Sequence, residues 1–195
     1  MPQQYAFVAI PDADIPPAAF PFARHLLRTY VSEINKTISV WRTFSDDDLE
    51  LRPHPAATTV AGILRHQLLS ERRFFGEFLG APEPPPDQVL PSPLTITACV
   101  RRLEELARAR LPYLASRDEA WWLVTVPFFD VERERIWIFW RRVLHTAHHR
   151  TQLTVYLRAA GRAVPSTYGP TADVTWTDAD PTTSVAAAGR RGVNG

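Results

Sequence analysis

The sequence predicts an all-α protein, a four-helix bundle, from three observations. Four segments of about twenty or more residues carry apolar side chains at spacings of three and four, the period of a helix with one buried face. No convincing run of strands accompanies them. A proline-rich stretch between the second and third segments favours one longer crossover connection over a set of tight turns.

The chain is expected to form one domain over residues 1–175, because 195 residues, 45% of them hydrophobic, suffice to bury a core. Prolines interrupt residues 1–17 and predict an extended lead-in. The first helix is expected over residues 18–44, with inward positions at Leu26, Tyr30, Ile34, Ile38, Trp41 and Phe44. Ser45 and the acidic residues after it predict a turn and a short capped helical piece.

The second and third helices are expected on either side of the proline-rich stretch. The second begins at Thr58 or Thr59, either of which can cap it, and stops at Gly80. Residues 81–93 contain six prolines, so they are expected to be a stiff extended connection. The third helix follows over residues 94–114.

The C-terminal part of the sequence predicts one more long helix, an aromatic segment before it and a tail after it. Pro112 is expected to bend or end the third helix. Residues 120–135 form either a short aromatic strand or an aromatic loop, and local pattern does not decide between them. The last helix is expected from Glu134 to Ala160, stopped by Gly161. Residues 176–195 have few apolar anchors and are expected to be a flexible tail.

Composition narrows the class of function. The formal net charge is +1, and the 22 basic residues are scattered among 21 acidic ones, so no basic patch indicates a nucleic-acid partner. The single cysteine, Cys99, excludes an internal disulfide and is read as a small buried apolar residue in a reducing cytoplasm. Neither a signal peptide nor an apolar run long enough for a membrane span is evident, which predicts a cytoplasmic protein.

Two histidines in the last helix are the main functional feature of the sequence. His145 and His149 lie about 40° apart around a helix and about 6 Å apart along it, so both rings can reach one ion. Gln152 and Tyr156 share their face, which is expected to point toward the bundle interior and to line any cavity there. His148 lies about 60° to the other side and is interpreted as a flanking polar group or a partner of a ligand.

The third imidazole is expected to be His66, midway along the second helix. Gly62, one turn earlier, would allow another backbone or a substrate to approach closely. Three imidazoles without cysteine suit Zn, Ni, Fe or Mn and leave coordination positions open. Histidine pairs at this spacing also occur as hydrogen-bonded core residues, and His25 and His54 are read as solvated surface residues.

Several motifs together resemble the DinB/YfiT-like superfamily over residues 20–173. They are Ser45-Asp-Asp-Asp-Leu-Glu-Leu-Arg-Pro before the second helix, Ile63-Leu-Arg-His66 within it, His145-x-x-x-His149-Arg150-x-Gln152 in the last helix, and the closing Val164-Pro-Ser-Thr-Tyr-Gly-Pro-Thr-Ala-Asp173. The resemblance implies an up-down-down-up bundle, a homodimer, and a divalent metal held by His66, His145 and His149. It implies no ligand role for Arg150 or Gln152; Arg150, turned away from His145, is expected to make an ion pair.

Characterised members of that superfamily include metal-dependent transferases and isomerases that use low-molecular-weight thiols such as mycothiol and bacillithiol, and others are described as hydrolases. The resemblance therefore implies a metal-dependent enzyme acting on a small molecule, and no DNA-binding role. Residues 81–93 and 121–129 are either walls of its pocket or ordinary packed connections. The competing hypothesis is a non-catalytic metal-binding or interaction bundle, which a closed fourth ligand or the lack of an adjoining cavity would favour.

Overall fold

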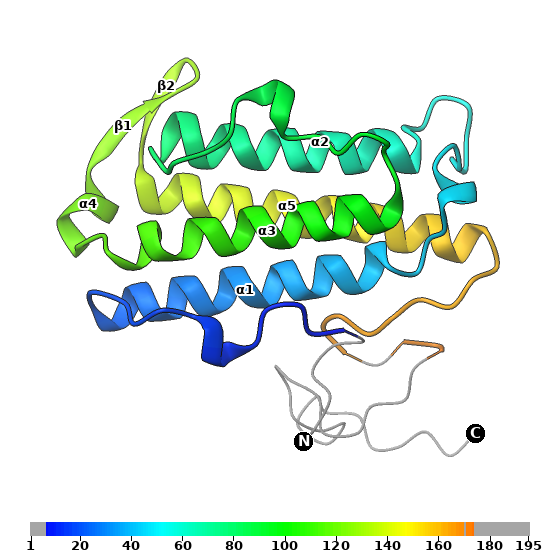
Figure 1. The fold of residues 1–195 in the computed structure, drawn as a ribbon, viewed down its shortest axis with the longest axis horizontal. Helices are drawn as coiled ribbons and strands as arrows, with labels where there is room; N and C mark the ends of the chain where they lie inside the picture. Colours follow the sequence, from blue (N-terminus) through cyan, green and yellow to red (C-terminus); the bar gives the residue numbers. More distant parts are fainter. Residues whose placement is uncertain (1–6, 170, 174–195) are drawn as a thin grey trace.

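The computed structural model describes residues 7–169 and 171–173, and its long helices lie side by side as a bundle (Figure 1). The helices are α1 (Pro21–Trp41), α2 (Val60–Arg73), α3 (Ile96–Ala115), α4 (Glu119–Leu123) and α5 (Arg135–Ala159), and the strands are β1 (Thr125–Phe128) and β2 (Val131–Glu134). Short 3-10 turns occur at Asp12–Asp14, Asp46–Asp48 and Pro86–Gln88, and a π-helical turn, Phe74–Phe78, extends α2. The expected four-helix bundle is confirmed.

The helix directions follow an up-down-down-up order. In Figure 1, α1 and α5 run one way along the bundle, and α2 and α3 run the other way. Because α2 and α3 are parallel, the chain between them must return along the length of the bundle, and residues 79–95 make that crossover. Six prolines keep this segment out of helix, so the proline-rich composition predicts the unusual connection.

Side-chain caps set the helix starts. The Thr59 hydroxyl accepts a hydrogen bond from the Gly62 N–H at the start of α2, and Thr95 does the same for Ala98 at the start of α3. At Gly62 a Cβ would lie 2.6 Å from the Thr58 side chain, so the close approach expected there comes from the chain itself. Gly80, with φ of 69°, ends the π-helical turn as expected.

The region before α5 combines a short helix with a hairpin. α4 is followed by the antiparallel pair β1 and β2, in which Thr125 faces Glu134 and Phe128 faces Val131. Phe129, in the tight turn between the strands, has φ of 54°, a left-handed conformation that is uncommon for a bulky residue. Pro112 lies inside α3, which continues to Ala115 before it ends.

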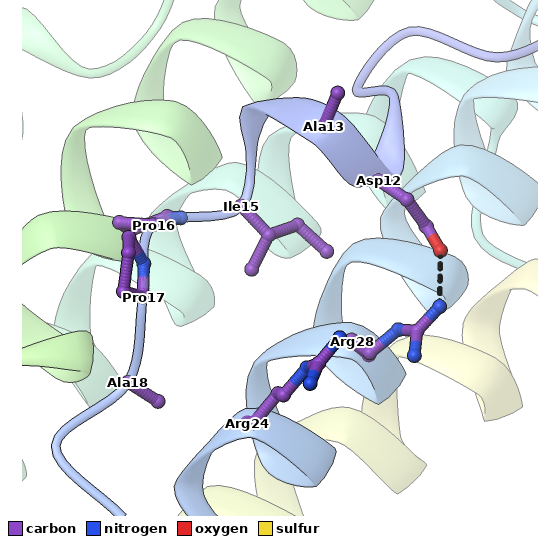
Figure 2. Close-up of a pocket in the computed structure, with 8 residues that line it drawn as sticks. All are labelled: Asp12, Ala13, Ile15, Pro16, Pro17, Ala18, Arg24 and Arg28. Atoms are coloured by element: carbon purple, nitrogen blue, oxygen red, sulfur yellow. Dashed lines mark hydrogen bonds and ion pairs between the residues drawn. The ribbon is translucent and has the colours of Figure 1, made fainter.

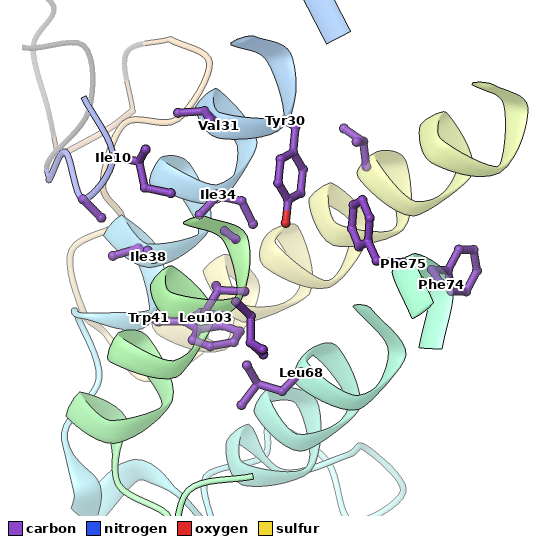
Figure 3. Close-up of a cluster of buried hydrophobic side chains, with 14 of the residues drawn as sticks. Ile10, Tyr30, Val31, Ile34, Ile38, Trp41, Leu68, Phe74, Phe75 and Leu103 are labelled. Carbon is purple, nitrogen blue, oxygen red and sulfur yellow. The ribbon is translucent and has the colours of Figure 1, made fainter. Parts of the chain in front are cut away.

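The described residues share one apolar core between the helices. Figure 3 shows Tyr30 of α1 beside Phe75 of the π-helical turn, with Phe74 at the margin of the cluster. Cys99 is fully buried, and burial raises the pKa of its thiol to about 11, in keeping with an apolar rather than a reactive role. Ile10 is also fully buried, and its N–H donates to the Asn35 side chain, which anchors the lead-in on α1.

Two buried ion-pair clusters connect elements that are distant in sequence. Arg110 of α3 donates to Glu83 in the crossover and to Glu71 of α2. Arg150 of α5 pairs with Glu33 of α1 at 2.6 Å, the ion pair expected for this arginine.

No helix in the described ranges combines the length and apolar character that a membrane span requires. The expected tail, residues 176–195, lies outside the described residues.

Candidate metal centre

The packing of α2 against α5 brings together three histidines that are far apart in sequence. His66 lies in the middle of α2, and His145 and His149 lie one turn apart on α5. Their ring nitrogens include one from each residue that all lie within 4.8 Å of one another. The triad that the resemblance implies is therefore assembled by the fold.

The spacing of the rings is compatible with a shared ion. The Nε2 atoms of His145 and His149 are 3.2 Å apart. Two nitrogens bound tetrahedrally to zinc at about 2.0–2.1 Å would be separated by about 3.3 Å, so these two atoms already stand near that separation. The His66 ring centroid lies 5.2 Å from that of His145 and 4.7 Å from that of His149. The donor set of three imidazoles fits a divalent transition metal.

The triad lies at the surface of the α2–α5 pair rather than deep in the bundle. His66 is exposed, and His145 and His149 are partly buried. This differs from the expectation that the pair points into the interior. Instead, two buried polar side chains occupy the interior here: Arg142, which contacts Nδ1 of His145, and Gln67, which accepts from Arg142. The three imidazoles therefore remain accessible to an exogenous ligand from solvent.

A chain of hydrogen bonds orients His149. Its Nδ1 lies 3.0 Å from Oε1 of Gln152, and because a carbonyl oxygen accepts, Nδ1 carries the proton and donates. The Gln152 amide in turn donates to the Tyr156 hydroxyl, which donates to the Thr58 carbonyl at 2.7 Å. Nε2 of His149 is thus left unprotonated and faces the triad, the state in which an imidazole binds a metal.

A buried arginine that the sequence reading missed contacts His145. Nη1 of Arg142 lies 3.0 Å from Nδ1 of His145 and 2.7 Å from the Ser70 hydroxyl. Its Nη2 donates to the Thr146 hydroxyl and to the Gln67 amide oxygen.

All four partners of Arg142 are uncharged, although the carboxylate of Glu71, which pairs with Arg110, also acts on Arg142, and burial lowers the pKa of Arg142 to about 10. The guanidinium therefore brings positive charge to the inner side of His145. The sequence held one indication of this role: Arg142 lies three residues before His145, inside an apolar helix.

The surroundings keep the three histidines neutral. Burial and then Arg142 lower the pKa of His66, and burial followed by Arg142 and the other two imidazoles lowers the pKa of His145 to about 3. Burial also lowers the pKa of His149, against the hydrogen bond to Gln152. Neutral imidazole is the form that binds a metal ion. Arg142 can only donate, so Nδ1 of His145 accepts and Nε2 of the neutral ring carries the proton, which it donates to Nε2 of His149 at 3.2 Å. This proton must leave Nε2 of His145 before that atom can bind an ion.

Among the other candidate histidines, His148 adjoins the triad but is not one of the three whose ring nitrogens converge. His148 is exposed, and its ring centroid lies 4.9 Å from that of His149 and 6.4 Å from that of His145, which fits a flanking position. His25 and His54 are exposed, as expected.

A cavity of about 520 Å³ lies elsewhere, between the lead-in and the start of α1 (Figure 2). Arg24 and Arg28 line one side, and Arg28 pairs with Asp12 across it at 2.6 Å. The rest of its lining is proline, alanine and isoleucine from the lead-in. No residue of α2 or α5 lines this cavity, so it is separate from the histidine site. The side chains able to bind a metal ion are at the histidine site.

Comparisons with known proteins identify a family and solved structures with a similar fold. A family model described as the DinB family matches residues 18–180. A solved DinB-like protein from Bacillus cereus is similar, with a TM-score of 0.63 at 20% identity over 73% of this chain and 95% of that one. A second, YjoA from Bacillus subtilis, has a TM-score of 0.60 at 18% identity over 74% of this chain and 96% of that one. No curated protein matches the sequence.

Proposed function

This chain belongs to the DinB family, and from that premise we propose that it is a divalent-metal-binding protein and a metal-dependent enzyme acting on a small molecule. The observation that carries the proposal is the convergence of His66, His145 and His149 at an accessible position. A catalytic metal site typically has three protein ligands and one coordination position open to solvent, whereas a structural site has four protein ligands. The triad has three imidazoles and is open to solvent on one side.

Each residue of the site has a separate task in this proposal. His66, His145 and His149 would hold the ion, which could be Zn, Ni, Fe or Mn. When bound, it would lower the pKa of a coordinated water or hold a thiolate. Gln152 keeps the proton of His149 on Nδ1, and Arg142 adds positive charge that favours an anionic reactant. The reaction class that follows is transfer of a thiol, or hydrolysis, at a small electrophile.

The partners belong to the same proposal. A low-molecular-weight thiol is the proposed co-substrate, and a homodimer is the proposed assembly. Both rest on the family resemblance. Light scattering of the purified protein tests the assembly, and a thiol-conjugation assay against a panel of electrophiles tests the reaction.

The metal site is tested by replacing His149 with alanine. We expect the purified His149→Ala protein to lose stoichiometric metal in elemental analysis while its helical circular dichroism is retained, because the imidazole is partly exposed and supports little packing. His148→Ala is the matched control, since it removes an exposed imidazole from the same helix and should leave the metal content unchanged. Full metal content in His149→Ala would remove this residue from the ligand set.

Turnover is tested separately from metal binding. If the protein binds metal and conjugates a thiol, His149→Ala should lose both properties together. Stoichiometric metal without turnover of any electrophile in the panel would instead support the non-catalytic metal-binding bundle.

A further inference from the structure

An aromatic cluster adjoins the histidine triad at one end of the α2–α5 pair. We call it the aromatic wall; it consists of Phe74, Phe78, Phe128, Phe129 and Trp137. The Phe74 ring lies nearly parallel to the His145 ring, with centroids 6.5 Å apart and an interplanar angle of 13°. Phe74 in turn contacts Phe128 at 5.6 Å. The wall therefore begins at a proposed ligand and continues away from it.

The outer part of the aromatic wall is open to solvent. Phe74 and Phe128 are 7% exposed and form its base, whereas Phe129 is 57% exposed and Trp137 is 43% exposed. Both outer rings touch the base, Phe129 at 4.7 Å and Trp137 at 5.5 Å from Phe128. Contiguous exposed aromatic surface beside a site is typical of a surface that receives a ligand.

The backbone conformation of Phe129 also supports a ligand-binding role for the aromatic wall. Its φ of 54° places a bulky side chain in the left-handed region, where glycine or asparagine would be less strained. The Phe129 ring packs against Phe78 and Phe128 and lies under the Arg73 guanidinium, and 57% of the residue still faces solvent. Strained backbone conformations cluster at active sites and ligand-binding segments.

The charges around the triad favour an anion. Arg142 contacts His145 directly, and Arg141, on the exposed side of α5, lies close enough to act electrostatically on the same ring. Of the other arginines in α5, Arg150 and Arg158 are paired with Glu33 and Asp173, so the charge near the triad comes from Arg141 and Arg142. A divalent ion bound by neutral imidazoles would add to this positive charge, and an anionic ligand would offset it.

We infer that the site takes a small anion with an aromatic body, whose charged donor occupies the open side of the triad and whose ring lies against the aromatic wall. This inference rests on the proposed function and names its substrate class. The donor is a carboxylate or a thiolate. A ring attached to such a donor by a short linker would extend past the buried Phe74, beside His145, toward the exposed Phe129, whose ring centroid lies 6.5 Å from that of Phe74.

The test uses cobalt-loaded full-length protein, in which ligand binding is followed by visible absorption. Titration with 3-phenylpropionate and with propionate compares two carboxylates that differ by a phenyl group. We expect the aromatic acid to bind about tenfold more tightly or better, the scale expected for burying a phenyl ring. The neutral 3-phenylpropanamide should bind more weakly than the acid. Phenylmethanethiol against ethanethiol repeats the comparison for thiolates and shows which donor is preferred.

Variants locate the preference on the wall. Phe129→Ala and Trp137→Ala should each reduce the affinity for 3-phenylpropionate severalfold while leaving that for propionate unchanged. Phe22→Ala removes a similarly exposed phenyl ring from the start of α1 and should change neither affinity. Equal affinities for the two acids, or an unaltered preference in both wall variants, would overturn the inference while the proposed function stands. Failure of the wild-type protein to bind cobalt would overturn both.

Discussion

The hydrogen bond between Gln152 and His149 determines which nitrogen of that histidine faces the triad. If the acceptor is lost, Nδ1 no longer has a partner that holds its proton, and the ring can adopt the other tautomer or rotate. We therefore expect Gln152→Leu to weaken metal binding by about 10-fold to 100-fold, as for other residues that orient a metal ligand. Competition with a chelating dye measures the affinity.

A matched substitution separates orientation from packing. Gln152→Glu keeps an oxygen acceptor for Nδ1 in a side chain of similar size, so it should retain most of the affinity. Equal affinities for wild type and Gln152→Leu would show that the hydrogen bond does not orient the ligand.

Sequence reading at the residue scale succeeded where periodicity was informative. The i, i+4 spacing of His145 and His149 fixes a shared face without any tertiary information. His66 required the family resemblance, because α2 is apolar over much of its circumference. Arg142 was missed because its role depends on partners contributed by another helix, Ser70 and Gln67.

At the scale of elements, the crossover is held to the bundle by a buried carboxylate. Both oxygens of Glu83 accept from Arg110, and the two side chains are 2% and 0% exposed. Burial raises the pKa of Glu83, against the hydrogen bonds from Arg110. This contact fixes where the crossover lies along α3. The prolines of the crossover prevent it from forming a helix.

Removing this carboxylate should destabilise the whole protein. Glu83→Leu would leave two N–H groups of Arg110 buried without partners, and we expect the free energy of unfolding to fall by about 3–5 kcal/mol. Urea denaturation measures the change. Asp87→Asn, an exposed substitution in the same crossover, should have little effect. Similar midpoints for the two variants would show that Glu83 does not anchor the crossover.

The elements themselves were largely predictable, and the exceptions have physical causes. Capping threonines and the proline run set the limits of α2 and α3, whose starts and ends lie close to those expected. Residues 120–135 remained open between strand and loop because their aromatic run has neither a helical nor a clear strand period. The structure resolves them into α4 and a hairpin whose packing is tertiary, against Phe74 and Phe78.

At the scale of the whole molecule, Glu33 joins the first and last long helices. It accepts from Arg150 of α5 and from Lys36 of its own helix, and the Tyr168 hydroxyl donates to it from the segment after α5. Burial alone would raise the pKa of Glu33, but Arg150 and Lys36 outweigh it and hold the pKa below its usual value of 4.5.

This shift predicts how stability depends on pH. Above pH 4.5 the carboxylate is ionised in both the folded and unfolded states, and its stabilising effect is fully present. As the pH falls below 4.5 the unfolded chain takes up the proton first, so this contribution is lost through the lower folded-state pKa. Denaturation of Glu33→Gln should show a deficit of about 3–5 kcal/mol at pH 7 that shrinks on acidification. Glu50→Gln, an exposed control, should follow wild type, whereas a deficit independent of pH would contradict the linkage.

Two of the three imidazoles reside on α5, the last long helix of the chain, and the third resides on α2. A polypeptide synthesised only as far as α2 therefore contains one of the three proposed ligands, too few to bind the proposed ion tightly. We therefore expect tight binding of the proposed ion only after α5 has docked on α2, so that metal content would report completed folding of the bundle.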